Sequence, residues 1–143
     1  MMRYLIVATY VLMISSCLNP PDYSEIPAIT FDSISAKDVV ANKDSITFYI
    51  SFTDGDGDLG SETDSNLFIT DSRTGFPHPD KIPEITPSGK VKSVSGQIVF
   101  TLSEIDSVPD GKLDSALYTI QILDRAGHLS NQIISPTVII HAD

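Results

Sequence analysis

Hydrophobic and polar residues alternate along much of the chain, and the alternation has a period of two. It is clearest in residues 45–53, where Ile46, Phe48, Ile50 and Phe52 fall on one face and smaller or more polar residues fall on the other. A period of two is typical of a β-strand that buries one face. We therefore expect a β-strand here, with these four side chains in the core.

Similar short segments recur, separated by glycine, proline, asparagine and aspartate residues that favour turns. Gly96 is expected to form a bend or bulge between two of them. Residues 37–44 indicate a turn, and the prolines within residues 72–89 exclude a regular central strand there. The predicted strands cover residues 28–35, 45–53, 66–71, 91–95, 97–103, 115–124 and 132–141.

About seven short strands in one domain predict an all-β fold, a single immunoglobulin-like β-sandwich over residues 28–143. The chain has one cysteine and no tryptophan, so the disulfide and the central tryptophan of antibody domains are both absent. A jelly roll or a small barrel is the alternative. In the sandwich, the loop after the second strand and the hairpin before the last strand lie at the same end.

The N-terminal region, residues 1–16, has the layout of a secretory signal peptide that is removed from the mature protein. Arg3 precedes an apolar run over residues 4–14, which is short for a membrane span, and two small residues follow. The segment Ile-Ser-Ser-Cys that ends at Cys17 resembles the lipobox of bacterial lipoproteins. That resemblance implies that Cys17 is acylated, becomes the new N-terminus and anchors the protein to a membrane. The alternative is an uncleaved anchor helix with an incidental cysteine.

Residues 17–27 contain three prolines and several polar residues without an apolar period, which is typical of a short tether. Leu18 stands where some lipoproteins have the aspartate that retains them at the inner membrane. The resemblance therefore implies the outer membrane, and it leaves open whether the domain faces the periplasm or the cell surface.

Charge narrows the choice of partners. The chain has 19 acidic and 9 basic residues and a formal net charge of −10. Nucleic acids and anionic lipid surfaces bind basic proteins preferentially, so neither is expected as a partner of this acidic chain.

Three aspartates follow the strand at residues 45–53 at every second position, Asp54, Asp56 and Asp58, with glycines between them. Like charges this close repel one another unless a cation lies among them. Aspartates at this spacing can converge on one hard ion, as positions 1, 3 and 5 of a calcium loop do. Leu59 and Ser65 stand where a helix-loop-helix calcium hand has glycine and glutamate, so that motif is excluded. The sequence predicts a structural calcium ion, and a metal-free turn is the alternative because Asp-Gly also favours hairpins.

The segment Asp-Arg-Ala-Gly-His-Leu-Ser-Asn at residues 124–131 resembles the closing hairpin of bacterial immunoglobulin-like and cadherin-like domains. Together with the aspartates and the lipobox, it makes the chain similar to small lipoproteins of Bacteroidota, a resemblance that supplies no activity. The sandwich topology can bring Asp124 to Asp54, Asp56 and Asp58 as a further metal ligand. Asp124 is otherwise a residue that stabilises its own hairpin turn.

Catalytic motifs are absent from the sequence. It contains no Gly-x-Ser-x-Gly elbow, no His-Glu-x-x-His and no phosphate loop, and no two histidines have the spacing of zinc ligands. We therefore expect a non-catalytic, calcium-stabilised binding or adhesion module whose partner is a protein or a glycan. The alternatives are a structural or accessory subunit of an outer-membrane complex and a glycan-active hydrolase.

Overall fold

A computed structural model describes residues 21–86, 92–103, 105 and 113–143 of the chain. These residues form β-strands and no helix, which confirms the all-β prediction. The strands are β1 (Ala28–Ile34), β2 (Asp38–Val40), β3 (Ile46–Asp54), β4 (Leu67–Asp71), β5 (Pro77–Asp80), β6 (Val94–Leu102), β7 (Asp114–Ala116), β8 (Tyr118–Ile122), β9 (Ile133–Ile134) and β10 (Val138–His141).

The predicted signal peptide, residues 1–16, and Cys17 lie outside the described residues. Within the part of the chain that is described, no helix is long and apolar enough to cross a membrane.

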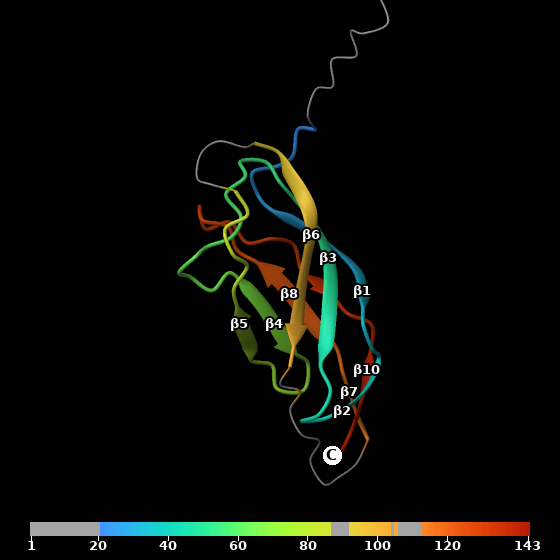
Figure 1. Cartoon of the computed structure of the whole chain (residues 1–143). Coiled ribbons are helices and arrows are strands. Elements are labelled where there is room, and N and C mark those ends of the chain that lie inside the picture. Colours follow the sequence, from blue (N-terminus) through green and yellow to red (C-terminus); the bar gives the residue numbers. More distant parts are fainter. Residues whose placement is uncertain (1–20, 87–91, 104, 106–112) are drawn as a thin grey trace, which may run out of the picture.

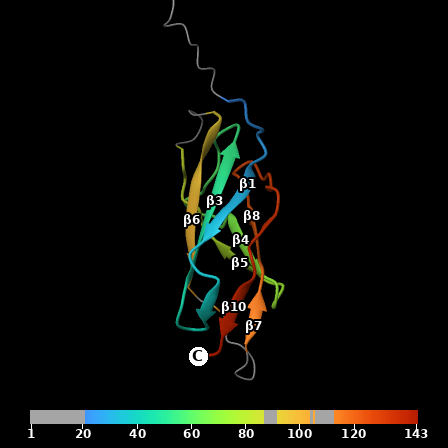
Figure 2. The same ribbon diagram turned by 90° about the vertical axis from the view of Figure 1, so that its right-hand side faces the viewer.

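The strands make three sheets, with the orders β1-β3-β6, β5-β4-β8-β9 and β2-β10-β7. Neighbouring strands are antiparallel except β2 and β10, which are parallel. The two larger sheets pack on a shared core, and Figures 1 and 2 show β3 and β6 on one side and β4 and β8 on the other. The small sheet lies at the end of the molecule that is remote from the N-terminal segment (Figure 1).

The core forms because β3 and β8 both alternate buried and half-buried residues along their whole length. Phe48 of β3 is fully buried and joins the two sheets. Its ring stacks on Phe100 of β6, with ring centroids 5.0 Å apart, and meets Tyr118 of β8 edge-on at 5.5 Å. The prediction that alternate residues of this strand form the core is confirmed.

The prediction of two strands separated at Gly96 is wrong within the described residues. Strand β6 runs through Gly96, which pairs with Phe52 of β3 in an unbroken register. A side chain at Gly96 would lie 3.1 Å from the Phe52 ring, so the glycine makes room for that ring. The register shift of this sheet lies instead in β1, between Phe31 and Ser33.

Two short strands form where the sequence analysis expected none. Strand β5 lies within the proline-containing segment and pairs only with β4, as an exposed edge strand. An edge tolerates proline because one side of the strand needs no hydrogen-bond donors, so the exclusion of a central strand was correct. The expected turn at residues 37–44 contains β2, which pairs with β10.

The last two predicted strands are each divided because the chain changes sheet. Leu117 separates β7, which pairs with β10, from β8, which pairs with β4. Ser135, Pro136 and Thr137 separate β9 from β10, and the Ser135 hydroxyl accepts a hydrogen bond from the Tyr118 amide at 3.0 Å. This hydroxyl replaces a ladder partner where the strand breaks.

The aspartate loop (residues 54–60) leaves β3, and the 123–131 hairpin leaves β8, at the same end of the fold. Leu59 forms an isolated β-bridge with Asp124, which joins the two segments directly. The prediction that the aspartates and the hairpin share an end is confirmed.

Candidate metal centre

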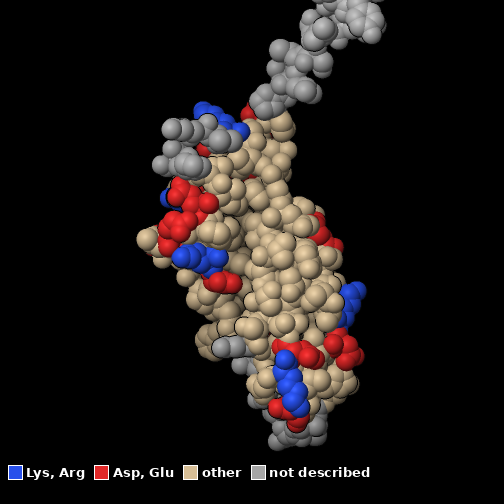
Figure 3. Space-filling view, viewed as in Figure 1, with Lys and Arg blue, Asp and Glu red and all other residues tan. Residues whose placement is uncertain are grey.

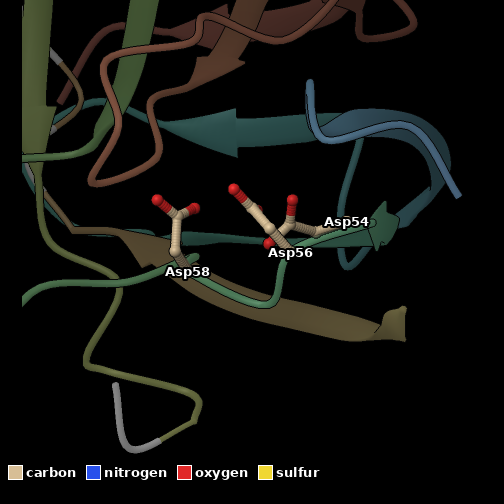
Figure 4. A group of neighbouring side chains, drawn as sticks. All are labelled: Asp54, Asp56 and Asp58. Atoms are coloured by element: carbon tan, nitrogen blue, oxygen red, sulfur yellow. The ribbon is translucent and has the colours of Figure 1, made fainter. Parts of the chain in front are cut away.

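The aspartate loop brings three carboxylates together. Asp54, Asp56 and Asp58 each offer one oxygen, and these oxygens lie within 4.8 Å of one another. Figure 4 shows the three side chains pointing to the same side of the loop. The group could hold a metal ion, as their spacing predicts.

Burial makes this cluster costly without a counter-charge. Asp54 ends β3 on its inward face and is completely buried, while Asp56 and Asp58 are half-buried. Both oxygens of Asp54, Oδ1 of Asp56 and Oδ1 of Asp58 are buried without a hydrogen-bond partner. Buried acceptors are nearly always satisfied, and a buried charge without a partner is strongly destabilising. A cation among these four oxygens would give the unpaired acceptors a partner and would neutralise the buried negative charge.

The same environment changes the acidity of Asp54. Burial raises the pKa of its carboxyl from 3.8 to about 6, and the negative charges of Asp56 and Asp58 add to the rise. The backbone amides of Asp58 and Leu59 oppose this pKa rise, although neither makes a hydrogen bond of normal geometry to the carboxylate. The carboxyl therefore holds its proton more tightly in the folded chain than in the unfolded chain.

The pKa of Asp58 is raised as well. Burial raises the pKa of its carboxyl, and the negative charges of Asp124 and Asp56 contribute. The amide of Ala126 and the positive charge of Arg125 lower the pKa of Asp58 in part. Negative charge is thus concentrated at the point where the loop meets the hairpin.

Two glycines allow the backbone conformation of the aspartate loop. Gly57 and Gly60 have φ angles of 72° and 92°, in the left-handed region that other residues rarely adopt. The carbonyl of Gly57 accepts a hydrogen bond from the Thr86 hydroxyl. A side chain at Gly60 would lie 2.2 Å from the carbonyl oxygen of Pro83, so this position has no space for one.

The hairpin is joined to the loop through Asp58. Its Oδ2 accepts a hydrogen bond from the amide of Ala126 at 2.9 Å, and its carbonyl accepts one from the amide of Arg125 at 3.4 Å. One oxygen of Asp58 therefore positions the hairpin, while Oδ1 remains for a cation.

Asp124 lies next to this group but its carboxylate has other partners. Its Oδ1 accepts a hydrogen bond from the amide of His128 at 2.7 Å, and its Oδ2 lies 2.9 Å from Nδ1 of the same residue. Only Asp54, Asp56 and Asp58 form the described three-carboxylate group. Direct ligation by Asp124 stays a prediction.

The sequence predicts His128 only as a hairpin-tip residue bonded to a backbone carbonyl, whereas its ring contacts the carboxylate of Asp124. The hydrogen bond and the charge of Asp124 raise the pKa of His128, and the charges of Asp56 and Asp58 raise it further. The sequence signal was the separation of four residues across a glycine-containing turn, which lets residue 128 fold back onto residue 124.

A cleft of about 560 Å³ opens beside the metal centre. Arg125 crosses it, donating from its guanidinium to the carbonyl of Gly60 at 3.1 Å and pairing with Glu84 at 3.2 Å. Figure 3 shows acidic side chains with basic ones between them along this flank, whereas the broad face of β3 and β6 carries few charges. The cleft is lined by Gly60, Ser61, Glu62, Thr63, Asp64, Ser65, Asn66, Glu84, Leu123, Asp124, Arg125 and Gly127.

Comparison of the chain with protein-family models, with curated proteins and with solved structures finds no match. Arguments about function therefore rest on the site itself.

Proposed function

We propose that this chain is a lipid-anchored envelope protein whose aspartate loop binds calcium, and that the ion stabilises one end of a binding module. The observation that carries the proposal is Asp54, a completely buried carboxylate without a hydrogen-bond partner for either oxygen. Two further carboxylates converge on it. Such a group is stable in a folded protein when a cation occupies it.

Calcium fits this donor set better than other common metals. The three side chains supply only oxygen, whereas zinc and softer metals favour nitrogen and sulfur. Calcium accepts six to eight oxygens in irregular arrangements, and magnesium requires a stricter octahedron. Backbone carbonyls of the loop and water would complete the coordination.

The strand order supports an immunoglobulin-like sandwich. One sheet of that fold contains the first, second and fifth main strands, and the other contains the third, sixth and seventh. Counting β1, β3, β4, β5, β6, β8 and β9 as the seven strands gives this division, with the fourth strand, β5, paired to β4 in the second sheet, and β2, β7 and β10 form the small additional sheet. Loops at one end of such a sandwich commonly carry binding sites.

The cleft supports a binding role at the metal end. Its volume of about 560 Å³ is within the usual range for ligand sites. The exposed hydroxyl of Ser65 and the nearby carboxylates offer hydrogen bonds to a glycan or a protein segment, whereas the hydroxyls of Ser61 and Thr63 already bond within their own turn. The metal would hold the aspartate loop, whose last residue, Gly60, lines this cleft.

We propose binding in preference to hydrolysis because the Asp124–His128 pair lacks a nucleophile nearby in the chain. Ser130 is the nearest hydroxyl in sequence, and it accepts a hydrogen bond from the amide of Ile122 at 3.0 Å and donates to the carbonyl of Asn131 at 2.8 Å. These bonds hold it in the hairpin backbone. The anchor through Cys17 rests on the lipobox resemblance, and the intact mass of the membrane-extracted protein tests it.

Thermal melting with and without calcium tests the metal site. An ion that binds only the folded state stabilises it by about 2.7 kcal/mol when its concentration is a hundredfold its dissociation constant. We expect the melting temperature to rise with calcium and to rise less with magnesium. The double variant Asp56→Asn, Asp58→Asn should lose the response.

Asp38→Asn is the matched control, because Asp38 is an exposed aspartate of β2 that pairs with His141 far from the loop. It should keep the full calcium response. Identical wild-type melting curves in calcium and in chelator would show that the aspartate loop is only a turn.

A further inference from the structure

The predicted tether (residues 17–27) contacts the aspartate loop at Gly55. The amide of Gly55 donates a hydrogen bond to the carbonyl of Ser24 at 2.7 Å. Tyr23 is half-buried and Pro27 is buried, so this part of the tether packs on the domain. Figure 4 shows the N-terminal segment, in blue, beside the end of the loop that carries Asp54.

The close contact with the tether requires a glycine at position 55. The backbone conformation of this residue does not require one. Unlike Gly57 and Gly60, it does not have a positive φ angle. A Cβ added to Gly55 would lie 2.3 Å from the carbonyl oxygen of Tyr23 and 2.7 Å from the carbonyl carbon and oxygen of Ser24. The three nearest obstacles all belong to the tether, so the glycine allows the tether to lie directly on the loop.

The same residue fixes two metal ligands. Gly55 stands between Asp54 and Asp56, and its carbonyl accepts a hydrogen bond from the amide of Ser93 at 2.9 Å. The backbone between the two carboxylates is therefore held by the tether on one side and by the segment before β6 on the other. Release of the tether would free one of these two restraints.

We infer that cation binding and docking of the tether are coupled through Gly55. The inference rests on the proposed calcium site: an ion that draws Asp54 and Asp56 together fixes the amide to which Ser24 binds. By linkage, the docked tether raises calcium affinity by the same factor by which calcium favours docking.

Coupling would set the position of the domain at the membrane. Tyr23 lies six positions after Cys17, so an extended chain spans at most about 20 Å between their Cα atoms. With the tether docked, the metal end of the sandwich faces the bilayer at this distance. Without calcium, a longer free segment would let the domain rotate about its anchor.

Hydrogen–deuterium exchange of the full lipidated chain in detergent tests the coupling. The reporters are the amide of Gly55 and the amide of Ile26, which donates to the Ser24 hydroxyl at 3.0 Å. We expect saturating calcium to slow exchange at both at least tenfold relative to chelator. In Gly55→Ala, calcium should leave exchange of Ile26 unchanged, and the calcium dissociation constant measured by calorimetry should rise at least tenfold.

Gly75→Ala is the control, since Gly75 has a φ of 73° at a hairpin tip with nothing within 4 Å of an added Cβ. It should retain both effects of calcium. Heat of calcium binding without any change in exchange at Gly55 and Ile26 would overturn the coupling and leave the metal site standing. Absence of calcium binding to the wild type would overturn both. If Gly55→Ala does not fold, the wild-type exchange comparison alone decides.

Discussion

Oδ2 of Asp58 accepts a hydrogen bond from the amide of Ala126 at 2.9 Å, across 68 residues of sequence. The bond connects the aspartate loop to the hairpin that follows β8. Asp58 therefore has two separable roles, as an acceptor for the hairpin and as a negative charge within the three-carboxylate group.

Two variants separate these roles. Asparagine at position 58 keeps an acceptor oxygen and removes the charge, so Asp58→Asn should be at least as stable as the wild type in chelator because repulsion from Asp56 and Asp124 is relieved. Asp58→Ala removes the acceptor as well and should lose about 1 kcal/mol relative to Asp58→Asn. Urea denaturation in chelator measures both. Equal stability of the two variants would mean that the bond to Ala126 contributes nothing.

The raised pKa of Asp54 predicts an unusual pH dependence for the metal-free protein. Because the folded-state pKa is about 6 and the ordinary value is 3.8, the folded chain binds more protons than the unfolded chain between these values. The contribution of Asp54 to stability is therefore present below about pH 4 and is lost as the pH rises to about 6. Melting in chelator across this range should show a steeper loss for the wild type than for Asp54→Asn.

In calcium, the stability of the protein should instead rise with pH, since the ion and the proton compete for the carboxylate of Asp54. The rise in melting temperature caused by calcium should be larger at about pH 7.5 than at about pH 5, where Asp54 is largely protonated in the metal-free protein. A calcium response that is independent of pH would place the ion away from Asp54.

His128 offers a spectroscopic report on the metal centre. Its pKa is raised by Asp124 first and then by Asp56 and Asp58. A calcium ion would neutralise the last two charges, so an NMR titration of the His128 ring should give a lower pKa in calcium than in chelator. Asp124→Asn should lower the pKa in both conditions. The ring of His141, which pairs with Asp38 at the other end of the fold, is the internal control, and its resonances should not change when calcium is added.

Two glycines with the same φ angle distinguish strain from lack of space. Gly60 and Gly127 both have a φ of 92°, but an added Cβ meets Pro83 at Gly60 and nothing within 4 Å at Gly127. Gly127→Ala should cost roughly 1–2 kcal/mol from backbone strain alone. Gly60→Ala should cost more, measured by urea denaturation of both variants. Equal losses would show that the loop moves away from Pro83 without cost.

Strands β1, β3 and β4 and the position of the site followed from patterns that are local in sequence. Alternation placed Ile46, Phe48, Ile50 and Phe52 in the core, and its continuation by one more step places Asp54 on the same inward face. The same end of the fold for the loop and the hairpin followed from the topology of a two-sheet sandwich. Both arguments depend only on the period of the hydrophobic residues and on the order of the strands along the chain.

Other features depend on contacts between distant residues, which no local pattern contains. Gly96 marks the position of the Phe52 ring and not a bend, and Gly55 marks the path of the tether and not a turn. The pairing of Asp124 with His128 satisfies a carboxylate that topology alone would assign to the metal. In each case the residue type was informative, but its partner was set by the tertiary structure.

The parallel pairing of β2 with β10 has a mechanical consequence for an anchored protein. The described chain begins at one end of the molecule and finishes at the other (Figure 1). A force between the proposed membrane anchor at Cys17 and a partner held near the C-terminus would pull β2 and β10 in opposite directions along their length. Their hydrogen bonds would then carry the load together in shear, instead of opening one after another as in a peeled hairpin.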